Sequence, residues 1–423
     1  MKAIRLNEHE SALVVQGADD THFTVQDVEA LERVQRAAKI DAFRWTGKNQ
    51  ITTRQFVGIL ASAGARLEIL PKIDGLDDGY TRRVLMRMIG IAWDVPVRDG
   101  EVTGHDYQNC DLIEILIGLF ARRLQEQIRA GLSREYCRHD DDLSRLRGKM
   151  DVTRQFTKLA ASPQKLACRY DEFTADTSLN RLLLCAVTFL RRHSVSAGTQ
   201  RLLNEITVHF SDVQLVSASE ALAAKLTPDR GNARWGILAR LARRFLLSEY
   251  QTVHGGNREG IALLFDMNVL FESYVSALAR KAYLPLGYEV RTQGPHSYLT
   301  CDKAFQTRPD LHCKRGDDVF VLDTKWKKLD SGKPNCGVSQ NDAYQMHAYA
   351  HVYRSCATIL LYPHHSGLSA LPGERRWWQF KSGDSSLILA TIEVAKAPDE
   401  LVAALRRLLE SAEERMKSTL AVA

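Results

Sequence analysis

The sequence predicts a mixed α+β protein in three consecutive parts, and three observations predict it. Short apolar runs broken by turn residues fill residues 1–105, which favours a β-rich N-terminal domain. Apolar positions at helical spacing dominate residues 106–250, which indicates a mainly helical region. Residues 251–423 alternate helical and strand-like runs, which is typical of an α/β domain. At roughly 150 residues per domain, the 423 residues allow about two to three such units.

The N-terminal part contains two runs with the composition of strands, residues 51–60 and residues 65–70. Pro71 ends the second run, and Asp74–Gly75 is typical of a turn. A helix is expected around Val25–Ala38. Together these elements indicate a small β-rich domain with one helix.

The middle part is expected to consist mainly of helices. Asp111 can cap a long helix that continues to Arg129, because apolar side chains recur at helical spacing and Gly131 follows its end. Further helices are expected at residues 179–192 and at residues 233–248.

One charged segment, Gly131–Lys149, interrupts these helices and is expected to be irregular. Its basic residues are Arg134, Arg138, Arg145, Arg147 and Lys149, and its acidic residues are Asp140, Asp141 and Asp142. Two interpretations are open. The segment is either a solvated loop or a surface that contacts a partner or a phosphate.

The C-terminal part begins after a break in the pattern at residues 254–257. A run of strands is expected between its first two helices. The expected helices are residues 265–284, 339–353 and 398–420, and the later expected strands are residues 358–362 and 387–394. This order is that of a mixed sheet covered by helices.

Composition excludes several classes of protein. With 45% apolar and 26% charged residues, the chain is neither disordered nor fibrous. The net charge of +6 permits a polyanionic partner but does not require one. The eight cysteines form no CxxC pair, so zinc ribbons and thioredoxin-type motifs are excluded. No signal peptide and no long uncharged apolar run is evident, and we expect a cytoplasmic protein that does not enter a membrane.

The run from Val319 to Trp326 carries the most informative pattern in the chain. Side chains in a strand alternate between its two faces, so Asp323 and Lys325 are expected on the same side. Asp310 is expected to end the preceding strand and to return beside them through a hairpin. Two carboxylates and one ammonium group would then meet at one edge of a sheet.

Such a group can support hydrolysis of a phosphodiester. The carboxylates of Asp310 and Asp323 can hold Mg²⁺, which prefers oxygen ligands, and the metal can polarise a phosphoryl oxygen. Lys325 can orient water or neutralise charge in the transition state. The alternative is a salt bridge between Asp323 and Lys325 at the strand edge, with Asp310 as a turn residue. The apolar strand before Asp323 favours the first interpretation, because buried charges are costly unless they are used.

Several further residues are candidates for supporting roles. Glu272 lies on a strongly apolar helix, where it is either an exposed glutamate or a third carboxylate of the metal site. Gln345 and Tyr349 lie four residues apart on one face of the next helix, which Ser339 and Asp342 can begin as a capping box.

A basic cluster follows the strand that carries Asp323. It consists of Lys325, Lys327, Lys328 and Lys333. Lys327 and Lys328 are the candidates for contacts with the DNA backbone, since phosphates attract such lysines wherever a duplex passes. The sequence has no P-loop motif, so any nucleotide-driven motor must be another polypeptide.

The chain resembles a known superfamily in the order of its motifs. A helix with Glu272, then Pro309–Asp310, then Asp323–Thr324–Lys325, then Gln345 and Tyr349, is similar to the PD-(D/E)xK nucleases. The similarity is closer to the McrC family, the nuclease subunits of modified-cytosine restriction systems. The stretches that carry it are Leu67–Ile73, Phe265–Glu272, Leu322–Lys327 and Asp342–Met346. They extend over roughly residues 50–365.

This resemblance implies a C-terminal nuclease domain that cuts DNA with Mg²⁺ at Asp310, Asp323 and Lys325. It also implies that about residues 1–150 dock on a hexameric AAA+ GTPase, McrB, and stimulate its GTP hydrolysis. The DNA would contain modified cytosine. Two alternatives stay open: a non-catalytic adaptor that only activates an AAA+ motor, and a nuclease that acts on RNA or on DNA repair intermediates.

Overall fold

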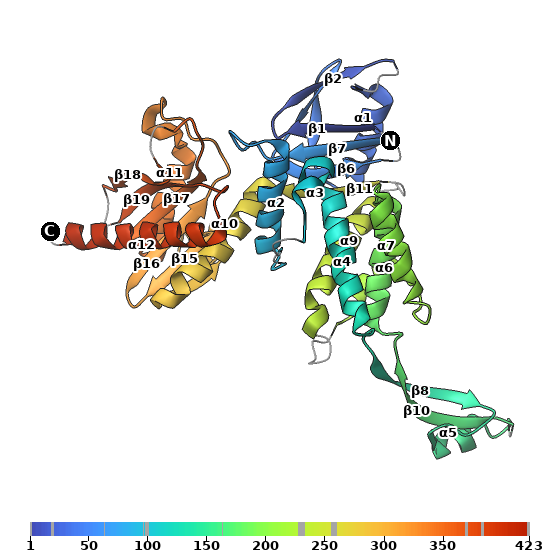
Figure 1. Cartoon of the computed structure of the whole chain (residues 1–423). Helices are drawn as coiled ribbons and strands as arrows, with labels where there is room; N and C mark the ends of the chain where they lie inside the picture. Colours follow the sequence, from blue (N-terminus) through green and yellow to red (C-terminus); the bar gives the residue numbers. More distant parts are fainter. Residues whose placement is uncertain are drawn as a thin grey trace.

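The computed structural model describes residues 2–17, 21–62, 64–95, 97, 101–162, 164–226, 233–254, 260–368, 371–381 and 385–420. It has the mixed fold class that the sequence predicts, with sheets in the N-terminal part, helices in the middle and a helix-covered sheet in the C-terminal part (Figure 1). No helix in the described ranges is long and apolar enough to span a bilayer. All eight cysteines lie in these ranges as free thiols.

Two sheets form the N-terminal part, with the strand orders β1-β7-β6-β11 and β3-β2-β5-β4. Their strands are β1 (Lys2–Asn7), β2 (Ser11–Val15), β3 (Phe23–Thr24), β4 (Phe43–Gly47), β5 (Gln50–Thr53), β6 (Phe56–Ala61), β7 (Ala65–Leu70) and β11 (Ile261–Asp266). Helix α1 (Val25–Ala37) packs beside them and begins at Thr24, whose side chain accepts the N–H of Asp27. The predicted helix at residues 25–38 and strand at residues 65–70 are confirmed.

Two predictions for the strands of this part are wrong. Residues 51–60 do not form one strand, because β5 ends at Thr53 and β6 belongs to the other sheet. Phe265 and Asp266 belong to β11 rather than to the following helix, because β11 pairs antiparallel with β6. This pairing places β11 in the N-terminal sheet, although it follows the domain boundary predicted at residue 250.

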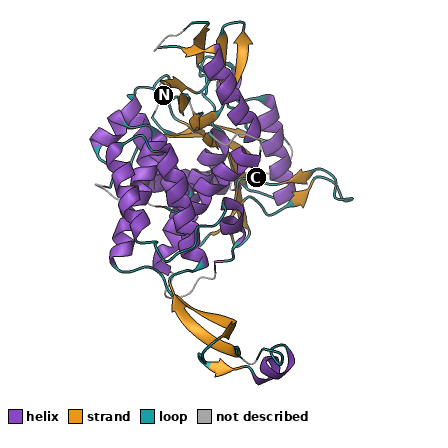
Figure 2. Ribbon diagram, turned by 90° about the vertical axis from the view of Figure 1, so that its right-hand side faces the viewer, coloured by secondary structure: helices purple, strands orange, loops and turns teal. Residues whose placement is uncertain are grey.

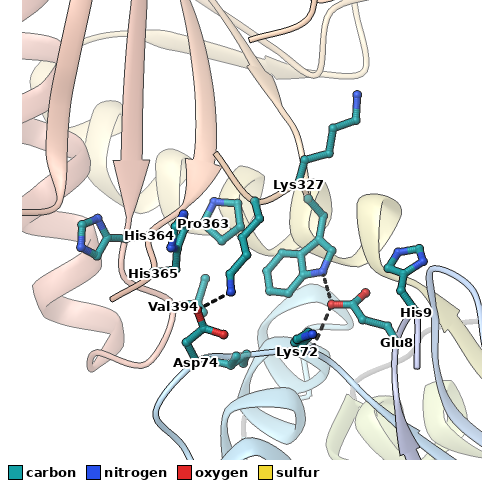
Figure 3. A pocket seen from close by; sticks show the side chains of 12 residues that line it. Glu8, His9, Lys72, Asp74, Lys327, Pro363, His364, His365 and Val394 are labelled. Atoms are coloured by element: carbon teal, nitrogen blue, oxygen red, sulfur yellow. Dashed lines mark hydrogen bonds and ion pairs between the residues drawn. The ribbon is translucent and has the colours of Figure 1, made fainter. Parts of the chain in front are cut away.

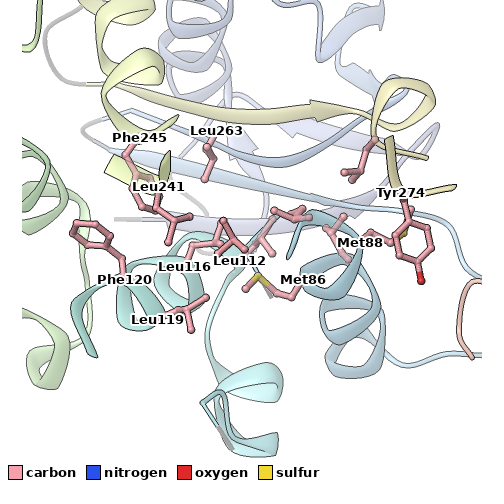
Figure 4. Close-up of a cluster of buried hydrophobic side chains, with 14 of the residues drawn as sticks. Met86, Met88, Leu112, Leu116, Leu119, Phe120, Leu241, Phe245, Leu263 and Tyr274 are labelled. Carbon is pink, nitrogen blue, oxygen red and sulfur yellow. The ribbon is translucent and has the colours of Figure 1, made fainter. Parts of the chain in front are cut away.

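Helices make up most of the middle part. They are α3 (Gly104–Asn109), α4 (Leu112–Arg129), α6 (Ser178–His193), α7 (Ala197–Val208), α8 (Ala218–Ala223), η1 (Ala233–Trp235) and α9 (Gly236–His254). Helix α2 (Asp78–Ala92) packs with them but lies in the N-terminal part, where only the helix at residues 25–38 was predicted. Asp111 caps α4 as predicted, since its side chain accepts the N–H of Glu114. Figure 4 shows Met86, Leu116 and Phe245 among the side chains that meet in one apolar core beneath the N-terminal sheet. Of the predicted break at residues 254–257, residues 255–257 lie outside the described ranges.

A small sheet projects from the far end of these helices (Figures 1 and 2). It contains β8 (Glu135–Leu143), β9 (Lys149–Met150) and β10 (Leu166–Thr174) in the order β8-β10-β9, with the short helix α5 (Val152–Thr157). We call residues 135–174 the arm. The prediction of an irregular segment at residues 131–149 is wrong, because β8 pairs with β10 along its whole length. Cross-strand ion pairs such as Arg169 with Asp140, at 2.8 Å, accompany this pairing.

The C-terminal part is a six-stranded sheet with helices on both faces. Its helices are α10 (Met267–Tyr283), η2 (Leu284–Leu286), η3 (Pro334–Gly337), α11 (Gln340–Tyr353) and α12 (Pro398–Leu420). Its strands, in sheet order, are β12 (Glu289–Thr292), β15 (Leu311–Arg315), β16 (Asp318–Thr324), β17 (Ala357–Pro363), β19 (Ser386–Ile392) and β18 (Gly373–Gln379). A two-stranded sheet of β13 (Ser297–Tyr298) and β14 (Gln306–Thr307) precedes β15. The helices predicted at residues 339–353 and 398–420 and the later strands are confirmed.

The alternation of side chains along β16 decides which helix each of them meets. Val319 and Val321 pack in the cluster that includes Met346 of α11. Phe320 and Leu322 belong to the core on the opposite face, which α10 and α12 cover. Asp323 continues the first series, so the alternation directs its side chain toward α11.

Candidate active site

Strands β15 and β16 form the predicted hairpin, and it brings Asp310 beside the end of β16. The two strands are antiparallel, with Leu311 opposite Leu322. Asp310 directly precedes β15 and does not end β14, which corrects one detail of the prediction. Its Oδ2 accepts the backbone N–H of Thr324 at 2.7 Å and the Thr324 hydroxyl at 2.8 Å. Burial nevertheless raises the pKa of the Asp310 carboxyl.

Asp323 and Lys325 meet on one side of the strand end, as their spacing predicts. The Lys325 Nζ lies 2.6 Å from Asp323 Oδ2, and Asp323 is only 2% exposed. Burial and the neighbouring Asp310 raise the pKa of the Asp323 carboxyl to about 6, although Lys325 opposes this shift. The ion pair of the alternative interpretation therefore exists, but the same ammonium group also feels the charges of Asp342 and Asp310.

Glu272, on α10, lies close enough to Asp310 and Asp323 for their charges to affect its carboxyl. Burial and the charges of Asp310 and Asp323 raise the pKa of its carboxyl to about 7. The amide of Gln293, just after β12, donates a hydrogen bond to it. Glu272 is therefore a partly buried residue of the site and not an exposed helical glutamate.

Gln345 and Tyr349 extend from α11 and support Lys325 from the other side. The Lys325 Nζ donates to Gln345 Oε1 at 3.1 Å, and Gln345 Nε2 donates to the Tyr349 hydroxyl at 2.9 Å. That hydroxyl in turn donates to the Arg308 carbonyl at 3.1 Å. Burial raises the pKa of Tyr349 to about 12, so it remains a neutral donor at physiological pH. The structure thus brings together every residue for which the sequence predicted a catalytic or supporting role.

Asp342 is a residue of the site for which the sequence suggested only a capping role. Ser339 does cap α11 by accepting the Asp342 N–H, but the Asp342 carboxylate points elsewhere. It lies 4.0 Å from Lys325 Nζ and 3.5 Å from Lys327 Nζ, and it accepts a hydrogen bond from Tyr362. Its position in the sequence, one helical turn before Gln345, was the signal for this role.

The two predicted DNA-binding lysines both lie next to the site, and each already has an acidic partner. Lys327 pairs with Asp342, and Lys328 forms an ion pair with Asp74 of the N-terminal part. Both lysine side chains are at least half exposed. They flank a pocket of about 330 Å³ between the N-terminal part and the end of β16 (Figure 3).

The charge balance at the site favours an added cation. Burial is the largest cause of the raised pKa values of Asp310, Asp323 and Glu272, and repulsion from Asp310 adds to it at Asp323 and Glu272. Lys325 opposes all three shifts, and Arg308 opposes those of Asp310 and Glu272. Among the described residues, no three or more His, Cys, Asp or Glu side chains are arranged to hold a metal ion, so the prediction that Glu272 completes the metal site with Asp310 and Asp323 is not supported. Asp310 and Asp323 alone still fit Mg²⁺, because this ion commonly uses one or two carboxylates and keeps several waters.

Comparisons with solved structures connect this fold to a known complex. A chain from Thermococcus gammatolerans, in a refined half-complex from a tetradecameric assembly of McrB AAA+ hexamers with bound McrC, has a similar fold with a TM-score of 0.74 at 20% identity. The match covers 97% of this chain and 100% of that chain. A chain of the cryo-EM structure of the Thermococcus gammatolerans McrBC complex matches with a TM-score of 0.51 at 22% identity, over 66% of this chain and 87% of that chain.

A comparison with models of protein families identifies the family of the sequence itself. No curated protein matches the chain. A family model, described as McrBC 5-methylcytosine restriction system component, matches residues 51–363, which is well over half of the sequence. The resemblance inferred from the ordered motifs is therefore confirmed, and the chain belongs to the family of McrBC 5-methylcytosine restriction system components.

Proposed function

We propose that the chain is the Mg²⁺-dependent DNA endonuclease subunit of a restriction system directed at modified cytosine. The observation that carries this proposal is the gathering of the Asp310, Asp323 and Glu272 carboxylates at the end of β16, where Lys325 forms an ion pair with Asp323. Families of restriction components act on DNA, and the family description supports DNA rather than RNA as the substrate.

Each residue of the site has a chemical task in this proposal. Asp310 and Asp323 would hold Mg²⁺, which polarises a phosphoryl oxygen and favours ionisation of water when it is bound. Lys325, fixed by Asp323 and Gln345, stabilises negative charge that develops on the phosphate. Glu272, with its pKa at about 7, can take up a proton near neutral pH. Lys327 and Lys328 contact the DNA backbone beside the site.

The proposal includes an AAA+ GTPase partner of the McrB type. The similar Thermococcus gammatolerans structures contain McrB AAA+ hexamers with McrC or the McrBC complex, which supports such a partner here. The partner would supply GTP-driven movement on DNA, and this chain would stimulate its GTP hydrolysis.

The arm is the surface that we propose for docking on this partner. Exposed apolar side chains gather on it: Tyr136, Leu146, Met150, Val152, Phe156 and Phe173. Such a group of exposed apolar side chains marks an interaction surface more often than an ordinary loop. The arm projects away from the C-terminal sheet (Figure 1), so a partner bound there would leave the cutting site open to DNA. This position favours the partner-contact interpretation of the charged segment within residues 131–149.

A non-catalytic adaptor that only activates the motor is the second candidate. In such a subunit Asp323 and Lys325 would form only a buried salt bridge, which contributes little to stability. The intact set of Asp310, Asp323 and Lys325 therefore supports the nuclease.

Substitution of Asp323 tests the proposal. Asp323→Ala should reduce DNA cleavage by a thousandfold or more, an order-of-magnitude expectation for loss of a metal ligand. Cleavage of DNA with modified cytosine is measured with the partner GTPase, GTP and Mg²⁺. Asp318→Asn, at the opposite end of the same strand, is the matched control and should cut normally. Normal cleavage by a folded Asp323→Ala protein would refute the nuclease assignment.

A further inference from the structure

The strand that carries the cutting site ends against the N-terminal part of the chain. Trp326 directly follows Lys325, and its indole Nε1–H donates a hydrogen bond to Glu8 Oε1 at 2.8 Å (Figure 3). Glu8 lies in the turn between β1 and β2, so this bond joins the first strands of the protein to the segment just after β16.

Glu8 is itself held rigidly in the N-terminal part. Its Oε1 also accepts the backbone N–H of Lys72, just after β7, at 3.0 Å. Its own N–H donates to the Leu70 carbonyl at 2.9 Å, and the residue is only 4% exposed. A hydrogen bond to a buried carboxylate is stronger than one between neutral groups. Glu8 therefore presents a fixed acceptor to Trp326.

Trp326 is held on a second side by the helix that carries Glu272. Its ring packs edge-on against Phe271, with ring centroids 5.3 Å apart, and Phe271 is fully buried. The ring of Trp326 is thus fixed between the N-terminal part and α10. The backbone N–H of Lys325 donates to the Leu361 carbonyl at 3.0 Å, and the fixed ring of the adjacent Trp326 holds the chain on the other side of Lys325.

We propose that Glu8 is a positioning residue for the cutting site and acts through Trp326. The Glu8–Trp326 bond holds the end of β16 so that Lys325 Nζ stays between Asp323 and Gln345. The geometry of the site consequently depends on a residue of the N-terminal part, some three hundred positions away in the sequence. This inference rests on the proposed nuclease function of the same site.

Two substitutions each remove one partner of the hydrogen bond. Trp326→Phe keeps an aromatic ring beside Phe271 but removes the N–H donor together with part of the indole, so it also alters packing. Glu8→Ala removes the acceptor. Both should lower kcat for DNA cleavage about tenfold or more, because small displacements of catalytic groups have effects of this size. The KM for DNA should change little, since neither residue is a proposed phosphate contact.

Conservative and matched variants complete the test. Glu8→Gln keeps an oxygen acceptor at Oε1, and it should restore most of the activity lost in Glu8→Ala. The double variant Glu8→Ala/Trp326→Phe should be no slower than the slower single variant, because one bond is lost in each case. Tyr80→Phe removes another contact across the same junction, the Tyr80 hydroxyl to the Ala395 carbonyl, and should leave kcat unchanged.

The outcomes distinguish this inference from the proposed function. Normal kcat in folded Trp326→Phe would overturn the positioning role, and this variant decides the matter even if Glu8→Ala fails to fold. A purely structural role would lower the yield of folded protein without changing kcat per folded molecule, which would also overturn it. If Lys325→Ala itself cut DNA normally, the proposed nuclease site and not merely the role of Glu8 would be wrong.

Discussion

Two clusters of buried charge occur in different parts of the chain, and they are built differently. In the N-terminal part, Glu68 of β7 faces Arg82 of α2, and both side chains are buried. The Arg82 Nε and Nη2 donate to the two Glu68 oxygens at 2.9 and 2.6 Å. The N–H of Leu112 donates to Glu68 Oε1 at 3.0 Å. Each charge therefore has a matched partner, and the cluster is closed.

The cluster at the end of β16 is open, in the sense that its carboxylates are not each matched by a cation. Asp310, Asp323 and Glu272 all have raised pKa values, with Lys325 as the ammonium group in ion-pair contact with Asp323. The comparison of the two clusters indicates that buried charge alone does not identify a functional site. A saturated pair holds two elements together, whereas carboxylates that lack full compensation are prepared for a further cation.

The largest expected effect on stability comes from opening the closed cluster. Glu68→Ala should lower the free energy of unfolding by about 3–5 kcal/mol, because it leaves the Arg82 charge buried without its carboxylate. Urea unfolding followed by circular dichroism measures this change. Asp323→Ala in EDTA should cost far less, since it removes one of several crowded carboxylates. Equal losses in the two variants would contradict the distinction between closed and open clusters.

A second prediction separates cutting from activation of the partner. Lys325→Ala should lower DNA cleavage about 10²–10³-fold, because it removes the charge that stabilises the developing oxyanion. It should leave stimulation of the GTPase partner nearly unchanged, since Lys325 lies in the C-terminal sheet and the proposed docking surface is the arm. GTP turnover and DNA cleavage are measured with equal concentrations of both proteins.

A substitution in the arm should have the complementary effect, on stimulation of the partner. Phe156 is 72% exposed, so Phe156→Ala should fold normally. It should weaken stimulation of the GTPase, and cleavage should fall with it if cutting depends on the partner as proposed. A folded Lys325→Ala protein that loses stimulation and cleavage together would show that the two functions are not divided between these regions.

Local patterns in the sequence predicted the open cluster well. The period of two in β16 placed Asp323 and Lys325 together, and the spacing of Gln345 and Tyr349 placed both on one face of α11. Each of these relations depends on a single element or a single hairpin. The sequence could therefore predict them without knowledge of distant contacts.

Relations between distant elements were not predictable in this way. Strand β11 pairs with β6 from far earlier in the chain, and Glu8 meets Trp326 across most of the sequence. The strands of the arm were not predicted for a different reason. Strand β8 is charged on both faces, so it lacks the alternation of apolar and polar residues that identifies a strand, and its pairing depends on complementary charges of β10.

The smallest expected effect concerns the pH dependence of stability at the open cluster. Burial, Asp310 and Asp323 hold the pKa of Glu272 at about 7, above the ordinary value of 4.5. Between these two pH values the folded protein keeps a proton that the unfolded chain has lost. The stability that this group contributes is therefore complete below pH 4.5 and is lost as the pH rises through about 7.

Glu272→Gln removes this titration, so the variant should lose less stability than the parent protein between about pH 5 and about pH 8. The expected difference is about 1 kcal/mol or less, because Glu272 is partly exposed and water screens its charge. Urea unfolding in EDTA at the two pH values measures it. Mg²⁺ should restore stability to the parent protein at the higher pH, since metal binding favours ionised carboxylates. Identical pH profiles for the two proteins in EDTA would show that the pKa of Glu272 is not raised in the folded protein.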